Sequence, residues 1–291
     1  MKRALTFLAG IVLLLPAVVA AADGDYESRP SVVHVSPARP QEITLRKAGS
    51  PTIDLRKLPY VAPRRRERPE HGEPEIQRIE LPGAIPGDAS GRVGASSVRP
   101  LAVAPAPGAS FDGLDFATWG MGHPPDTVGD VGPTYYIQAV NTSIGIYQKS
   151  SGALVAGFTF DSFMSQGNFG NSCDTENFGD PVVLYDSFED RWVISDFAFQ
   201  LDGTGAVNPP VAYECFAVSK SGDPVAGGWN YYSLQMTDGL NDYPKMGVWP
   251  DGIYMSANMF GFAAGSSFAG ARVWAINKAQ MYAGSPTVQV V

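Results

Sequence analysis

Short apolar segments rich in aromatic and β-branched residues recur along residues 109–291. Clusters of Gly, Asp, Asn and Pro separate them at intervals of about 8–12 residues, the usual spacing of consecutive short β-strands. Within this range, no stretch combines a helical apolar period with helix-capping residues. The pattern therefore predicts an all-β fold for residues 109–291.

Three stretches of this region share one order of turns and strands. Each opens on an acidic turn beside Pro or Gly, continues with a short apolar segment and a second turn, and ends in a strand-like run: His123–Asn141, Phe178–Asp196 and Asn241–Asn258. A strand that ends in Lys follows each stretch, and a fourth strand follows that lysine. The units recur with a period of about 50–60 residues, which is typical of stacked β-sheet repeats.

Each unit thus holds four short strands, the content of one propeller blade. We therefore predict a partial β-propeller of about three four-stranded blades. A closed ring takes about four to eight blades, and the sequence ends within a predicted strand at Val291. We expect the domain at 109–291 to be truncated at its C-terminus, or to obtain its remaining blades elsewhere. A β-sandwich of about 180 residues is the alternative.

The run Pro124–Asn141 resembles a family of bacterial secreted proteins with the pattern Pro-Pro-Asp-Thr-x-Gly-x-Val-Gly-Pro-x-x-Tyr-x-Gln-x-Val-Asn. Gly179–Trp192 and Asp242–Asp251 match two further segments of that family, and the likeness covers about residues 110–284. The resemblance implies a secreted or surface-associated β-propeller, often followed by adhesive or sorting domains. It implies no catalytic mechanism and no site residues.

The N-terminal part of the chain has a different composition. Residues 1–22 combine Lys2 and Arg3 with an apolar run and a small-residue cleavage site, Ala20–Ala22, and therefore predict a secretory signal peptide. An uncleaved membrane anchor is the alternative. After removal of the signal peptide we expect no membrane span, and a secreted location that is extracellular, on the cell surface or periplasmic.

Residues 23–108 are rich in Pro and charge, with 13 basic and 11 acidic residues, and we predict a disordered or loosely held leader. Its basic cluster Arg64–Arg68 suits a propeptide cleavage site, a contact with an anionic surface or a solvated linker. Two short apolar pieces, Ile43–Leu45 and Ile76–Leu81, could each dock on the domain as a strand.

The charge of residues 109–291 bears on the partners. This region holds 18 acidic and six basic residues, a net charge of −12. Such a surface repels nucleic acid and anionic membranes. We expect no nucleic-acid partner, and an extracellular glycan or protein as the ligand.

Three aspartates occupy equivalent places in the repeats: Asp126, Asp180 and Asp242. In a propeller, equivalent positions surround the axis, so these carboxylates are expected to converge where a cation or a sugar could bind. With Tyr243 they are also the candidate catalytic residues. The alternative is that each aspartate only caps its own turn.

The sequence contains no certain cofactor site, but Ca²⁺ is a candidate. Asp174, Glu176 and Asp180 bring carboxylates together within seven residues, and Asp126 and Asp130 form a similar pair. Calcium prefers oxygen ligands, although neither spacing is that of an EF-hand loop.

Cys173 and Cys215 are the only cysteines and predict a disulfide in an exported domain. The chain has three histidines, two of them in the leader, so residues 109–291 contain a single histidine that could serve a Cys-His or Ser-His-Asp site. We therefore favour a secreted or surface-associated binding or adhesion module for carbohydrate or protein, with Ca²⁺ as a candidate stabiliser. The alternative is a glycan-active hydrolase or lyase that uses Asp126, Asp180 and Asp242.

Overall fold

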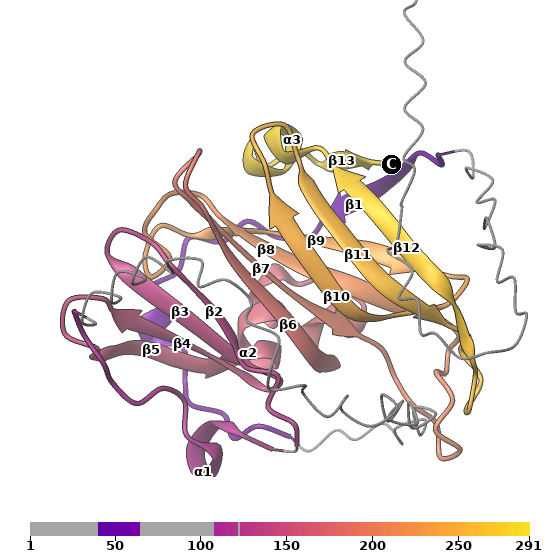
Figure 1. Ribbon diagram of the computed structural model, residues 1–291, viewed down its shortest axis with the longest axis horizontal. Coiled ribbons are helices and arrows are strands. Elements are labelled where there is room, and N and C mark those ends of the chain that lie inside the picture. The colour runs from indigo at the N-terminus through magenta and orange to yellow at the C-terminus, as the bar shows by residue number, and fades with distance from the viewer. Residues whose placement is uncertain (1–39, 65–107, 122) are drawn as a thin grey trace, which may run out of the picture. The chain divides into compact units, whose positions relative to one another are not determined.

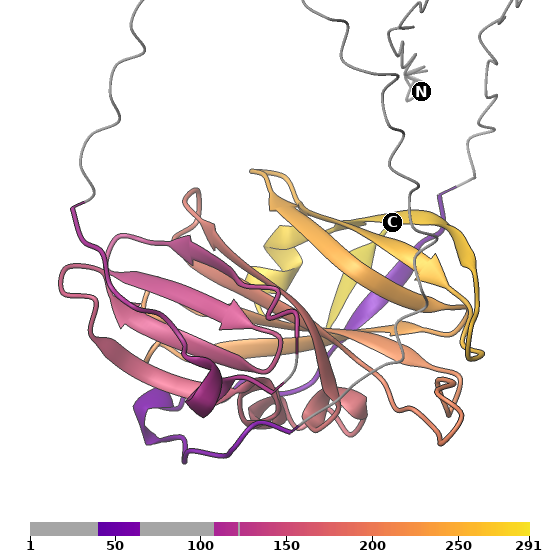
Figure 2. The ribbon, with the colours of Figure 1, turned by 60° about the horizontal axis from the view of Figure 1, so that its bottom comes forward.

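The computed structural model describes residues 40–64, 108–121 and 123–291 (Figures 1 and 2). The predicted signal peptide and the greater part of the predicted leader lie outside these ranges. Strands are the main regular structure, at 45% against 11% helix, so the all-β prediction for residues 109–291 is confirmed. In the described part of the chain, no helix is both long and apolar enough to cross a membrane.

The first sheet contains four antiparallel strands in chain order, β2-β3-β4-β5. They are β2 (Val128–Val131), β3 (Tyr135–Val140), β4 (Ser143–Gln148) and β5 (Leu154–Thr159). Alternation of polar and apolar residues turns one face of this sheet inward, with Ile137, Ile144 and Phe158 fully buried. This is the predicted four-stranded unit for the first repeat.

The second sheet has nine strands in the order β10-β11-β12-β13-β1-β9-β8-β7-β6. The second repeat supplies β6 (Asn177–Asp186), β7 (Arg191–Ala198), β8 (Ala212–Ser219) and β9 (Trp229–Met236). The third supplies β10 (Leu240–Val248), β11 (Ile253–Phe260), β12 (Phe268–Ile276) and β13 (Thr287–Val290). The outermost strands of this order, β6 and β10, lie next to each other (Figure 1).

Strand β1 (Ile43–Lys47) joins the two repeats within this sheet. It pairs antiparallel with β13, where Ile43 faces Val290, and with β9, where Lys47 faces Tyr232. Leu45 is fully buried in the core. The predicted loose leader at 23–108 is therefore too long: residues 40–64 belong to the domain, and only the docking of Ile43–Leu45 as a strand was anticipated.

The core has two parts, one on each face of β6–β9. One contains Phe216, Tyr232 and Trp274, and therefore lies between β6–β9 and β10–β13. The other contains Ile144, Trp192 and Tyr231, and lies between β6–β9 and the first sheet. Burial on both faces explains why β7 and β8 are almost continuously buried instead of alternating.

Short helices complete the described structure. They are η1 (Leu55–Lys57), α1 (Phe116–Trp119), α2 (Phe160–Met164), η2 (Ser165–Gly167), η3 (Ser172–Asp174) and α3 (Lys278–Tyr282). Most begin at a side chain that accepts a backbone N–H, as Thr159 does before α2 and Asn277 before α3.

Only the first repeat forms a separate four-stranded sheet, because β1 joins the strands of the other two repeats into one sheet. The predicted propeller of four-stranded blades is therefore not established.

Candidate functional site

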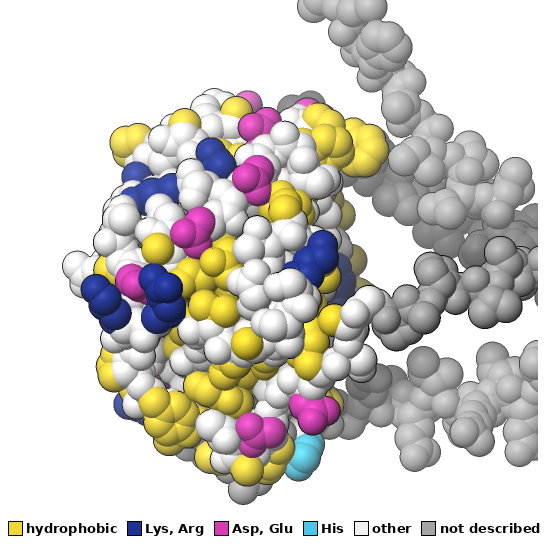
Figure 3. Space-filling model, turned by 90° about the vertical axis from the view of Figure 1, so that its left-hand side faces the viewer, with side chains coloured by type: hydrophobic (Ala, Val, Ile, Leu, Met, Phe, Trp, Pro, Cys, Tyr) yellow, Lys and Arg dark blue, Asp and Glu magenta, His cyan; other side chains and the backbone are white. Residues whose placement is uncertain are grey.

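An open cavity of about 1650 Å³ lies where the start of β6 meets β10. Its wall also includes residues 61–64, α1, α2 and the loop between β11 and β12. Carboxylates, amides and aromatic rings are mixed in the lining, including Asp161, Asn177, Asn258, Phe178, Phe199 and Phe268. Figure 3 shows that, on the side of the molecule where the first sheet lies, apolar side chains also reach the surface among polar ones.

The structure brings the three repeat aspartates together, since Asp126, Asp180 and Asp242 all line this cavity. Asn141 links two of them: its Nδ2 donates to Asp126 Oδ2 (2.7 Å), and its Oδ1 accepts the backbone N–H of Asp180 (2.9 Å). The side chains of Asp180 and Asp242 are also hydrogen-bonded, which requires that one carboxyl carries a proton. If each aspartate only capped its own turn, the three side chains would not need to line one cavity.

Backbone irregularities aim these groups away from the strands. Asp126, Asp180 and Tyr243 have φ values of 45°, 49° and 53°. The pairing of β6 skips from Gly179 to Val182, and that of β10 skips from Asp242 to Lys245. Such bulges turn a side chain out of the pleat and are frequent beside functional sites. Aspartate tolerates the left-handed region, whereas tyrosine is strained there.

The surroundings of Asp180 in the cavity shift the pKa of its carboxyl group. Burial, together with the charge of Asp242 and a hydrogen bond to it, raises the pKa of Asp180 to about 7. The charge of Asp126 raises this pKa further, and the backbone N–H of Tyr243, which donates to Asp180 Oδ2 (3.1 Å), lowers it. Asp180 is therefore poised to gain or lose a proton near neutral pH.

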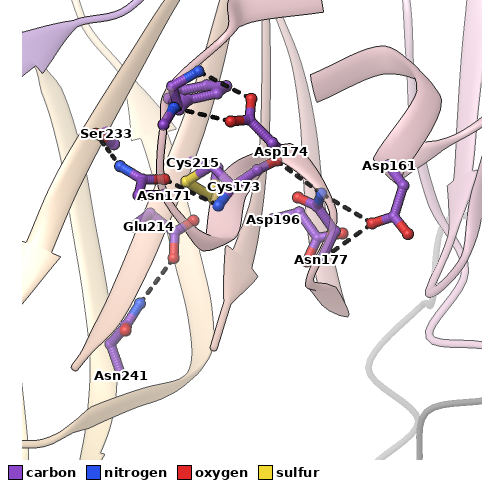
Figure 4. Close-up of a disulfide and its surroundings, with 12 residues drawn as sticks. Asp161, Asn171, Cys173, Asp174, Asn177, Asp196, Glu214, Cys215, Ser233 and Asn241 are labelled. Carbon is purple, nitrogen blue, oxygen red and sulfur yellow. Dashed lines mark hydrogen bonds between the residues drawn. A yellow bond between two sulfur atoms is a disulfide. The ribbon is translucent and has the colours of Figure 1, made fainter. Parts of the chain in front are cut away.

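Two fully buried carboxyl groups behind the cavity were missed from the sequence. Asp196 Oδ1 accepts the backbone N–H of Gly179 (2.9 Å), and burial raises the pKa of Asp196 well above its usual value. Glu214 Oε2 accepts from Asn241 Nδ2 (2.7 Å), and burial raises the pKa of Glu214 to about 8. Polar residues inside otherwise apolar strands were the available signal. Figure 4 shows Asp196 and Glu214 in the neighbourhood of the disulfide.

The predicted calcium ligands divide into two groups. Asp126, Asp174 and Asp180 line the cavity, but Asp174 already accepts the backbone N–H groups of Phe169 and Gly170, each at 2.8 Å. Asp130 and Glu176 are not in the lining, and Asp130 accepts the N–H of Tyr185. Among the described residues no three His, Cys, Asp or Glu side chains are grouped to hold a metal ion. Calcium binding stays a prediction.

The predicted disulfide between Cys173 and Cys215 is confirmed (Figure 4). It ties η3, which contains the cavity-lining residue Asp174 and shortly precedes Asn177, to β8 in the large sheet. The bond closes a separation of 42 residues. A crosslink of this span limits the unfolded chain and holds one wall of the cavity in place.

Tyr243 lies at the rim, with 53% of its surface exposed. The Nζ of Lys245 is 3.4 Å from the centroid of its ring, a cation–π contact. The side chain therefore offers an aromatic face that a cation already occupies, while its backbone N–H holds Asp180.

No protein-family model, curated protein or solved structure matches this chain. The family resemblance of its motifs therefore stays an expectation, and the function has to follow from the chemistry of the cavity.

Proposed function

We propose that the protein is an exported binding module whose cavity binds a carbohydrate. The observation that carries this proposal is the lining itself, in which Asp126, Asp180, Asp242 and Asn141 share one open cavity with aromatic rings. Carboxylates and amides bond sugar hydroxyl groups in defined directions, and aromatic faces pack against the apolar C–H faces of a sugar ring. The disulfide and the predicted signal peptide support an exported location.

We also propose that the three repeats are successive propeller blades. The two core clusters on opposite faces of β6–β9 support this, because each blade of a propeller packs between two neighbours. The first strand of the second repeat, β6, lies beside both β2 and β10, as inner strands would. In an experimental structure, the three four-stranded units should superimpose with Pro124, Pro181 and Pro244 in equivalent places. Units that do not superimpose would overturn the propeller assignment.

A glycan array followed by calorimetry tests carbohydrate binding. The full chain should bind at least one saccharide, and Asp180→Asn and Asp242→Asn should each weaken that binding about tenfold or more, the loss of a charge-assisted hydrogen bond. Glu189→Gln is a matched control, because it removes an exposed carboxylate outside the cavity lining. The proposal fails if no saccharide binds, or if folded Asp180 and Asp242 variants bind as tightly as Glu189→Gln.

A glycan hydrolase or lyase is the second candidate, favoured by the raised pKa of Asp180 beside Asp242. A general acid must hold its proton at the working pH, and a second carboxylate must stay ionised as base or nucleophile. Turnover of the bound glycan, measured as released reducing ends, distinguishes the two candidates. In an enzyme, Asp180→Asn abolishes turnover; in a binding module, the wild-type protein leaves the glycan intact.

A further inference from the structure

The cavity has an unbalanced set of charges. Its described lining includes six carboxylates, Asp115, Asp126, Asp161, Asp174, Asp180 and Asp242, against Arg64 and His123 as basic side chains. None of the interactions that set the protonation of Asp180 comes from a basic side chain. Because residues 109–291 also carry a net charge of −12, the cavity lies in a negative field that concentrates cations.

The buried layer behind the lining also holds polar side-chain oxygens and, among the described residues, no basic side chain next to the two aspartates. Asp196 Oδ2 and Asn241 Oδ1 are buried without a hydrogen-bond partner, and neither residue has any exposed surface. Asp196 is held against Gly179, the residue before Asp180, and Asn241 precedes Asp242. The residues packed behind Asp180 and Asp242 thus supply no positive charge to the β6–β10 junction. The carboxyl oxygens of Asp180 and Asp242 can therefore accept hydrogen bonds from a ligand that carries positive charge.

The aromatic part of the lining suits the same ligand. Lys245 shows that the ring of Tyr243 can hold an ammonium group at the rim. Phe178 and Phe199, stacked with ring centroids 4.1 Å apart, provide an apolar wall. Rings beside carboxylates recognise an organic cation, because the ring faces attract the charge and the carboxylates accept its N–H groups.

We propose that the saccharide ligand carries protonated amino groups, as a glucosamine oligomer does, and that one ammonium group binds at Asp180 and Asp242. This inference rests on the proposed carbohydrate-binding function and names its ligand class. The bound ammonium group donates hydrogen bonds to both carboxylates, so Asp180 gives up its proton to solvent when the ligand binds. Acetylation of the amine removes the charge and leaves the sugar ring unchanged.

The test compares two hexamers of equal length, one of glucosamine and one of N-acetylglucosamine, by calorimetry on the full chain. The comparison is made at pH 6, where an α-amino group with a pKa of about 8 is protonated, and the charge of the glucosamine hexamer at this pH is verified by titration of the free ligand. We expect the glucosamine hexamer to bind at least tenfold more tightly, to weaken as salt rises, and to release protons on binding. Asp242→Asn should lose at least tenfold in affinity, and Glu189→Gln should not.

The comparison of ligands is made on the wild-type protein, so it does not depend on a variant that folds. Equal or tighter binding of the acetylated hexamer overturns the inference. Binding of a neutral glycan alone also overturns it but leaves the proposed function intact, whereas failure of every saccharide overturns both. Tighter binding of oligolysine than of the glucosamine hexamer assigns the cavity to basic peptides and rejects the amino-sugar ligand.

Discussion

The Nζ of Lys278 lies 2.9 Å from Asp186 Oδ2, and the two side chains are only 3% and 0% exposed. Tyr282 donates its hydroxyl group to the same oxygen (2.9 Å), and the backbone N–H of Phe188 donates to Asp186 Oδ1. Asp186 ends β6 and Lys278 begins α3, so this buried pair joins the second and third repeats. An ion pair so little exposed is sensitive to the loss of either partner.

Lys278→Met should therefore lower the free energy of unfolding by about 3–5 kcal/mol, because it leaves the Asp186 carboxylate buried without its counter-charge. The exposed pair Arg272–Asp238 supplies the control, with side chains 39% and 60% exposed. Arg272→Met should cost about 0–1 kcal/mol. Urea unfolding followed by tryptophan fluorescence measures both. Equal effects of the two substitutions would contradict the prediction.

Strand β1 is expected to contribute to global stability. Leu45→Ala removes a fully buried side chain from the core and should cost about 2–5 kcal/mol. Ile43→Ala, in the same strand at a position that is 37% exposed, should cost much less. If Leu45→Ala unfolds at the wild-type urea concentration, residues 40–64 do not stabilise the domain.

The disulfide gives a prediction about redox conditions. With a sequence separation of 42 between its cysteines, the chain-entropy estimate of its contribution is about 4 kcal/mol. Addition of a reductant should therefore lower the urea midpoint of the wild-type protein, and the double variant Cys173→Ala, Cys215→Ala should not respond. If an assay of free thiols shows that the bond is reduced and the urea midpoint is unchanged, the disulfide does not contribute to the stability of the protein.

Glu214 gives a prediction about pH. Burial raises its pKa from 4.5 to about 8, so the folded protein holds a proton that the unfolded chain releases between these values. Its contribution to stability is therefore complete below about pH 4.5 and is lost as pH rises through about 8.

Glu214→Gln should flatten this pH dependence, because the glutamine stays neutral throughout. Unfolding free energies at pH 5 and pH 8.5 should differ less in Glu214→Gln than in the wild-type protein. Glu189→Gln, which alters an exposed carboxylate, should keep the wild-type slope. Parallel pH profiles for wild-type and Glu214→Gln would show that Glu214 is ionised in the folded protein.

The strand pattern was enough to predict the all-β class, the repeat pointed to the three aspartates that meet in the cavity, and the presence of only two cysteines predicted the disulfide. Equivalent places in a repeat share local structure, which explains why Asp180 and Asp242 both lie at bulges. Asn141 belongs to the first repeat motif, but its bridging role depends on the position of β6 and is not visible locally.

Two other features were beyond the sequence for physical reasons. The placement of β1 depends on β9 and β13, which are far away along the chain. The local sequence around Ile43 does not identify these partner strands. Asp196 and Glu214 lie in strands buried on both sides, where alternation no longer separates inside from outside. Their burial follows from packing between layers, which single-strand patterns do not reveal.

The pairing of Ile43 with Val290 has a consequence for the order of events during biosynthesis. Although β1 leaves the ribosome long before the other described strands, its β13 neighbour does not exist until residues 287–290 have been synthesised. Contacts of such long sequence separation are slow to form. A nascent chain therefore exposes an unpaired edge of β1 until β13 has been synthesised, and during this interval a chaperone can shield that edge.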